Sequence, residues 1–233
     1  MVANLPQPVL PGRRETCTVN AVDRIMAAMI PDYWLQAAAE LSATDPVMAG
    51  FAERYAGLAL ASRGDAFGTL ARSIVGQQIS VRAADAVWTR FRAAVGDVAP
   101  AAVLAAGPGG LAGCGLSQRK IEYLCDLAAH FADGRLDPGA WKELDDATLI
   151  AELCTVRGIG RWTAEMFLIF NLLRPDVYPL DDIGLQRAIC LHYFAGERQP
   201  RRTLAEFGER WRPWRSVATW YLWRSLDPVP VEY

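Results

Sequence analysis

The 233-residue sequence lacks the features that mark several large classes of protein. It has no run of about 18 uninterrupted apolar residues, the length that a membrane-spanning helix needs. Its first 30 residues lack the order of charged, apolar and small residues that a secretory signal shows. A glycine-rich phosphate loop, a nucleophile elbow and an HExxH zinc motif are also missing. We therefore expect no membrane partner, and a location in the cytoplasm, or at the nucleoid if the source is bacterial.

Metal-binding residues are scarce and scattered. No two of the five cysteines lie two to four residues apart, so the sequence offers no zinc or iron–sulfur ligand pattern. Two histidines, His130 and His192, are too few for a histidine-rich site. We expect the cysteines to be reduced thiols in the core, and catalysis to need no cofactor. The cysteines are Cys17, Cys114, Cys125, Cys154 and Cys190.

Positive charge is also in short supply for a duplex-binding protein. The formal net charge is -2, whereas such domains are usually basic. Arginines do gather near the C-terminus, where a solvated face with ion pairs inside helices is the simplest interpretation. These arginines are Arg198, Arg201, Arg202, Arg210, Arg212 and Arg215, against Glu197, Glu206 and Glu209.

Apolar residues are abundant, at 52% of the chain, and they recur with helical rather than strand spacing. The sequence therefore predicts an all-α protein, folded as one compact domain or two joined lobes. Asp45-Pro46, Asp65 and Ser117 are expected helix starts, Gly96 a helix stop, and 107–116 a flexible turn. The expected helices are 21–29, 33–42, 45–56, 66–76, 79–95, 100–106, 117–132, 145–155, 160–172, 182–195, 202–209 and 214–226.

The segment LCTVRGIGRWTAEMF is the most specific signal in the chain. A helix ending near Thr155 precedes a turn with Gly158 and Gly160, and a new helix begins around Arg161. The two glycines allow positive φ and close backbone approach, so N–H groups at the new helix's N-terminus can converge on one anion, such as a phosphate. A plain helical hairpin is the structural alternative.

About twenty residues after Gly160, the stretch RPDVYPLDDIGLQRA places Asp181 and Asp182 at the start of another helix. Aspartates are favoured at helix starts, so both acids could serve as caps. Because a proline-marked turn would fold this helix back beside the hairpin, one of the acids could instead be a catalyst.

Together, these stretches resemble the helix–hairpin–helix (HhH-GPD) superfamily of DNA glycosylases. The narrower resemblance is to the alkylbase branch, DNA-3-methyladenine glycosylase II. DAFGTLARSIVGQQISVRAADAVWTRF resembles a helix pair of that branch, and GLSQRKIEYLCDLA the segment ahead of its hairpin, so the similarity covers roughly 31–226. The resemblance implies a two-lobed helical glycosylase fold with the active site in a cleft between the lobes, in a short form lacking the N-terminal β-domain.

The resemblance also implies roles for individual residues. Asp182 would be the catalytic acid and Asp181 a helix cap or a supporting acceptor. Trp162 occupies the position of the lysine nucleophile in bifunctional relatives, which implies a monofunctional enzyme without lyase activity. The base pocket would comprise Trp162, Trp223, Met166 and Ile183, the last two where the family often has aromatic residues. For Trp211, Trp214 and Trp220 we expect core or rim positions.

The DNA-binding residues implied by the resemblance lie in two segments. One is the hairpin, and the other is the loop whose side chain fills the gap left by a flipped base, here offering Gln78. A monovalent cation, Na⁺ or K⁺, would be held by backbone carbonyls of Cys154, Val156 and Ile159. The full DNA-binding set is Gly158, Ile159, Gly160, Arg161, Thr163, Gln77, Gln78 and Ser80.

The expected activity is excision of alkylated bases of the 3-methyladenine class from double-stranded DNA by a monomer. Residues 1–65 would pack with 181–233 as one lobe, and 66–180 would form a central lobe with the hairpin at about 145–172. Two alternatives stay open: a catalytically silent DNA-binding or damage-sensing module, and a glycosylase of the same fold for another damaged base. Asp182 favours an enzyme over the silent module.

Overall fold

The computed structural model describes residues 30–62 and 64–226, and in these ranges the chain is helical, with no strand. The all-α prediction is therefore confirmed for this part of the chain. The expected helix at 21–29 lies outside the described residues. The α-helices are α2 Trp34–Thr44, α3 Pro46–Arg54, α4 Ala66–Gly76, α5 Val81–Val95, α6 Pro100–Leu111, α7 Gln118–Ala132, α8 Asp146–Leu153, α9 Arg161–Phe170, α10 Ile183–Tyr193, α11 Arg201–Gly208 and α12 Arg215–Leu226.

The helix starts follow the predicted capping residues. The side chain of Asp45 accepts hydrogen bonds from the backbone N–H groups of Val47 and Met48, with Pro46 at the first position of α3. Asp65 caps α4, and the Ser117 hydroxyl accepts from the Lys120 N–H at the start of α7. Such caps satisfy N–H groups that have no partner inside the helix.

The glycine-rich segment 107–116 differs from the expected flexible turn. Gly107, at φ 57°, breaks the helix, but α6 continues beyond it to Leu111 and is followed by the 3-10 helix η1, Ala112–Cys114. Leu111 and Cys114 are buried, and α6 packs on α7. Burial of these two side chains explains why a glycine-rich segment is helical here.

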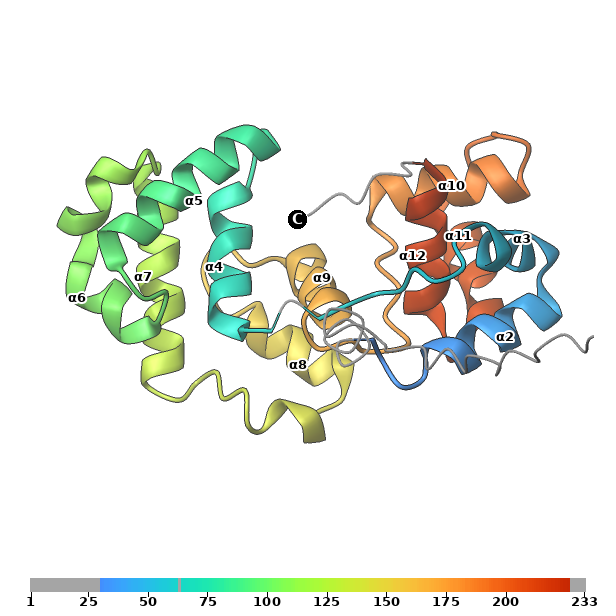
Figure 1. Cartoon of the computed structure of the whole chain (residues 1–233), viewed down its shortest axis with the longest axis horizontal. Helices are drawn as coiled ribbons and strands as arrows, with labels where there is room; N and C mark the ends of the chain where they lie inside the picture. Colours follow the sequence, from blue (N-terminus) through green and yellow to red (C-terminus); the bar gives the residue numbers. More distant parts are fainter. Residues whose placement is uncertain (1–29, 63, 227–233) are drawn as a thin grey trace, which may run out of the picture.

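The helices form two groups (Figure 1). In the first group, α12 packs against α2, α3 and α10. In the second group, α4, α5, α6 and α7 pack together. Helix α9 also belongs to the second group, because it contacts both α4 and α8. The predicted lobe boundaries, after residues 65 and 180, stay predictions. The helices within each predicted lobe do pack on one another.

Within the described residues, the segment that leads into α4 and the loop after α9 run between the groups, and hydrogen bonds link these two segments to each other. The Ser62 hydroxyl donates to the Asn171 carbonyl at 2.8 Å, and the Asn171 amide donates to the Gly64 carbonyl at 3.0 Å. Tyr33 from the first group also donates its hydroxyl to the Leu173 carbonyl at 2.6 Å. Because Asn171 is buried, these bonds hold the end of α9 between the two groups.

Among the described residues, no single helix is both long and apolar enough to cross a membrane. Only when Val81–Val95 and Pro100–Cys114 are taken together are they long and apolar enough, and a bend of 101° separates them.

Candidate active site and nucleic-acid interface

The hairpin turn between α8 and α9 is anchored by two buried side chains. Val156 and Ile159 point into the core, and the Ile159 N–H donates to the Val156 carbonyl at 3.1 Å. Gly158 has φ 88°, and a Cβ at this position would collide with the ring of Tyr123. Glycine is therefore required here both by backbone conformation and by close packing.

Gly160 has a different role from the one expected. It is the N-cap of α9 at φ -93°, so of the two glycines that allow positive φ, only Gly158 uses it. No side chain caps α9, and a Cβ at Gly160 would meet no atom within 4 Å. The N-terminus of α9 thus faces open space, and its first N–H groups are suited to bind an anion.

Arg161 and Glu165 form an ion pair on the first turn of α9. The Arg161 Nε donates to the Glu165 Oε1 at 2.8 Å, with the arginine side chain 68% exposed and the glutamate buried. Burial raises the pKa of Glu165 above its ordinary range, and Arg161 opposes that shift. Glu165 was not among the predicted site residues, although its spacing of four residues from Arg161 is typical of such an ion pair.

Asp182 lies where α10 begins, and its carboxylate accepts three hydrogen bonds. Oδ1 accepts from the backbone N–H of Leu185 at 2.7 Å and from the Trp223 indole Nε1 at 2.8 Å. Oδ2 accepts from the Trp162 indole Nε1 at 2.9 Å. Asp182 is 9% exposed. An ionised carboxylate, which only accepts, satisfies all three donors at once.

Asp181 does not cap α10, which corrects the division of roles expected for the two acids. The helix begins at Ile183, so Asp182 is the N-cap. Asp181 is instead exposed and accepts from the Arg201 Nε at 2.9 Å. This arginine holds the pKa of Asp181 below its ordinary value.

The two tryptophans bring separate parts of the chain to Asp182. Trp162 comes from α9 and is 38% exposed, whereas Trp223 comes from α12 and stacks on Phe170, with ring centroids 5.7 Å apart. A Cβ at Gly184 would lie 3.5 Å from the Trp223 ring and 3.1 Å from the Asp182 Oδ1. Gly184 therefore leaves the space in which this indole reaches the carboxylate.

The other two predicted pocket residues differ in exposure. Met166, one turn after Trp162, is buried, while Ile183, next to Asp182, is 80% exposed. The surface beside the carboxylate thus presents Trp162 and Ile183, with Met166 beneath it. Among the remaining tryptophans, Trp211 and Trp220 are buried as expected.

The second predicted DNA-binding segment is the turn between α4 and α5. Gln78 is exposed with φ 58°, an uncommon conformation for a residue other than glycine, and Ile79 beside it is also exposed. Gln77 is not free, because its Nε2 donates to the Gly158 carbonyl in the hairpin turn at 2.8 Å. Ser80 caps α5 by accepting from the Ala83 N–H.

The predicted cation ligands are backbone carbonyls in the hairpin turn. The Val156 carbonyl already accepts from the Ile159 N–H, which leaves one lone pair for an ion. Cys154 is exposed, contrary to the expectation that the cysteines lie in the core; Cys114 and Cys190 are buried. Within 30–62 and 64–226, no group of three or more His, Cys, Asp or Glu side chains could hold a metal.

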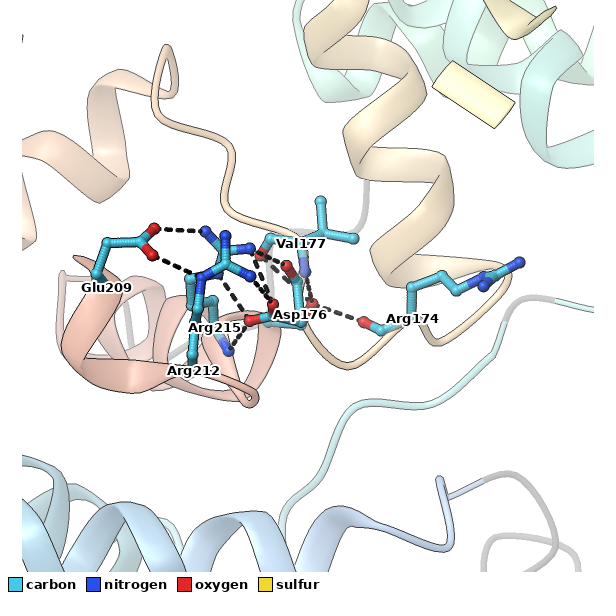
Figure 2. A network of polar contacts seen from close by, with 7 residues as sticks. Arg174, Asp176, Val177, Glu209, Arg212 and Arg215 are labelled. Carbon is cyan, nitrogen blue, oxygen red and sulfur yellow. Dashed lines mark hydrogen bonds and ion pairs between the residues drawn. The ribbon is translucent and has the colours of Figure 1, made fainter. Parts of the chain in front are cut away.

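The C-terminal arginines are mostly neutralised by acids. Asp176, in the loop after α9, accepts from Arg212 at 2.6 Å and from Arg215 at 2.7 Å, and Glu209 pairs with the same two arginines (Figure 2). Arg202 pairs with Glu206 within α11, as expected. The Asp176 pairs instead join different elements, so the interpretation as ion pairs inside helices does not cover them. Arg212 and Arg215 thus link Asp176, in the loop after α9, to the start of α12.

The described residues thus form a helical protein in which a helix–hairpin–helix with an uncapped second helix is accompanied by an aspartate that two indoles hold. The family comparison is more specific. Residues 71–213 match the model of the HhH-GPD superfamily base excision DNA repair protein, more than half of the chain. The chain belongs to this superfamily.

Individual relatives agree with this assignment. A putative DNA-3-methyladenine glycosylase of Bacillus subtilis is 37% identical over 111 residues, which are 48% of this chain and 39% of that relative. This chain therefore spans well under two thirds of that relative's length.

Solved structures show the same fold. A DNA-3-methyladenine glycosidase from Bacillus halodurans has a TM-score of 0.74 and 36% identity, covering 80% of this chain and 87% of that one. A Schizosaccharomyces pombe 3-methyladenine DNA glycosylase, solved in complex with abasic DNA, has a TM-score of 0.72 and 26% identity, covering 85% and 98%.

Proposed function

We propose that this protein excises alkylated bases of the 3-methyladenine class from double-stranded DNA by hydrolysing the N-glycosidic bond, the first step of base excision repair. The observation that carries the proposal is the Asp182 carboxylate, which the indole N–H groups of Trp162 and Trp223 hold next to the exposed residues Trp162 and Ile183. The similarity to DNA-3-methyladenine glycosylases supports the substrate class.

The chemistry needs a negative charge close to the sugar. Breaking the bond between C1′ and the base nitrogen passes through a transition state with oxocarbenium character. Asp182 would stabilise that positive charge and orient the attacking water, while the base leaves with the bonding electron pair. Because three N–H donors hold the carboxylate in place, little reorganisation is needed at the moment of bond cleavage.

The leaving base would stack against an aromatic face. A base alkylated at a ring nitrogen is cationic, and cation–π attraction to an indole is worth about 0.5–2 kcal/mol. Trp162 is exposed enough to offer such a face, and Ile183 would add apolar contact. The cationic base is also a good leaving group, so strong general-acid assistance is unnecessary.

Two turns would hold the duplex around the extruded nucleotide. The uncapped N-terminus of α9 would bind a backbone phosphate through residues 158–163, with the Arg161 guanidinium nearby. Gln78, exposed on the α4–α5 turn, would fill the gap left in the base stack. The protein would act as a monomer on duplex DNA, in the cytoplasm or at a bacterial nucleoid.

The protein would have no lyase activity. A lyase of this fold needs an amine nucleophile, and Trp162 stands at the family position for that lysine. The chain has two lysines: Lys120, whose Nζ donates to the Val75 carbonyl at 2.8 Å, and Lys142, in the 3-10 helix η2, Trp141–Glu143. Catalysis would need no cofactor. A structural Na⁺ or K⁺ on the carbonyls of Cys154, Val156 and Ile159 would suit their hard oxygen donors.

One assay tests activity, substrate and lyase chemistry together. The protein is incubated with duplexes that each carry one defined lesion, including 3-methyladenine, 1-methyladenine and 3-methylcytosine, and strand breaks are measured with and without alkali. We expect alkali-dependent breaks at 3-methyladenine and none without alkali. Binding to the damaged duplex without base release would instead identify a silent damage-sensing module. Release of a different damaged base alone would change the substrate class.

A further inference from the structure

The two turns that would hold DNA are connected by a side chain of one of them. The Gln77 Nε2 donates to the Gly158 carbonyl at 2.8 Å, across 81 positions of sequence. Gln77 is the C-cap of α4, and its backbone N–H already bonds to the Ile74 carbonyl at 3.3 Å. The carboxamide is therefore not required to end its own helix.

Helix α7 contacts both the α4–α5 turn and the hairpin turn. The Lys120 Nζ donates to the Val75 carbonyl at 2.8 Å, next to the α4–α5 turn. Three residues later, the Tyr123 ring lies against Gly158. After three more, the Asp126 Oδ2 accepts from the backbone N–H of Arg157 at 2.8 Å. Residues spaced by three lie on one face of a helix, so a single face of α7 contacts both turns.

The conformation of the α4–α5 turn suggests why such support is present. Gln78 holds φ 58°, a left-handed conformation that is strained for a residue other than glycine. Strained residues of this kind persist where neighbouring contacts over-determine them. Gln77 precedes Gln78 directly, and its bond to Gly158 restricts the backbone from which Gln78 projects.

We propose that Gln77 is a positioning residue that fixes the register between the α4–α5 turn and the hairpin, with Lys120, Tyr123 and Asp126 of α7 as the supporting face. Phosphate binding at 158–163 and insertion of Gln78 then occur as one event. Without the hydrogen bond from Gln77 to Gly158, the α4–α5 turn would have to become ordered when Gln78 enters the base stack, and this ordering has an entropic cost. The inference rests on the proposed function for its DNA substrate.

Binding to a stable abasic analogue tests the link without requiring base release. Affinities are measured for a duplex with one tetrahydrofuran site and for the same duplex intact. We expect wild type to prefer the tetrahydrofuran duplex and Gln77→Met, which keeps the side-chain length but not the donor, to lose about tenfold of that preference. Gln77→Ala provides a second variant, and Gln36→Met, on the exposed face of α2, is the matched control.

Hydrogen exchange separates positioning from general loss of structure. In wild type, the tetrahydrofuran duplex should protect the amides of 77–80 and of 158–163 together. In Gln77→Met, we expect protection of 158–163 to persist while 77–80 exchange freely, with an unfolding midpoint close to that of Gln36→Met.

The proposal is overturned if the preference stays within about twofold of wild type, if both turns remain protected together in Gln77→Met, or if wild type shows no preference. A wild type that prefers the tetrahydrofuran duplex but releases no base would contradict the proposed function alone, because the coupling is measured by binding.

Discussion

Two regions of this protein use the same local chemistry in different surroundings. Asp45 caps α3, and its Oδ2 accepts from the Tyr193 hydroxyl at 2.9 Å and the Trp211 indole at 3.1 Å. Asp182 caps α10 and also accepts from indole donors. Both acids are more than nine-tenths buried.

The difference lies in what surrounds each carboxylate. Around Asp45, Met48 and Trp211 are buried, so the acid is enclosed by core residues. Around Asp182, Trp162 and Ile183 are exposed, so the acid lies directly beneath the surface. An aspartate that caps a helix and accepts from an indole is thus a structural element at position 45 and a candidate catalyst at position 182. The exposure of the neighbouring residues distinguishes the two.

The largest expected effect is on chemistry at Asp182. Asp182→Asn retains an oxygen that can cap α10 but removes the negative charge, so base release should fall about 1,000-fold. Single-turnover excision of 3-methyladenine measures the loss, and binding to damaged duplex should persist. Asp45→Asn is the matched control, with excision per folded molecule close to wild type. An Asp182→Asn protein that excises at the parent rate would refute the catalytic role.

Asp45 should show the reverse pattern, with a large effect on stability. Asp45→Ala leaves two backbone N–H groups, the Tyr193 hydroxyl and the Trp211 indole without their acceptor. We expect the free energy of unfolding to fall by about 3 kcal/mol, measured by denaturant titration. If excision per folded molecule fell as steeply as in Asp182→Asn, the contrast between the two acids would be wrong.

An intermediate effect is expected from the indole donors. Trp223→Phe retains an aromatic ring near Phe170 but loses the N–H that holds the Asp182 Oδ1. The maximal excision rate should fall about tenfold, with a smaller change in DNA affinity. Trp214→Phe is the control, because its indole donates to Glu40 instead, at 2.6 Å. Equal rates for the two variants would argue against positioning by Trp223.

A smaller effect should appear in the pH dependence of stability. Burial raises the pKa of Glu165 above its ordinary 4.5, so at pH values just above 4.5 the folded state retains a proton that the unfolded chain has lost. This contribution to stability therefore declines as pH rises through that window. Glu165→Gln should gain stability relative to wild type between pH 4.5 and neutral, in denaturant titrations.

The smallest effect is expected at Asp181, the immediate neighbour of Asp182. Its ion pair with Arg201 is exposed to solvent, and such pairs contribute little to stability. Asp181→Asn should change the single-turnover excision rate by less than about twofold. A loss comparable to that of Asp182→Asn would mean that the two acids share the chemistry.

Much of the fold could be predicted from local sequence because its signals are local. Apolar spacing and capping residues placed α4 at its observed bounds and, apart from the end of α6, the other described helices within a few residues. The 107–116 segment was mispredicted, because burial of Leu111 and Cys114 outweighs the low helix propensity of its glycines.

The hairpin, the paired aspartates and the candidate tryptophans were determined by the sequence itself, since each is a short pattern of residue types. The tertiary structure alone decided which aspartate caps α10, that Trp162 and Trp223 reach the same carboxylate, and that Gln77 bonds to Gly158. The two indole bonds to Asp182 and the Gln77 bond depend on residues 20 to 81 positions apart meeting in space. Local patterns cannot specify such contacts, because the packing of the helices brings the residues together.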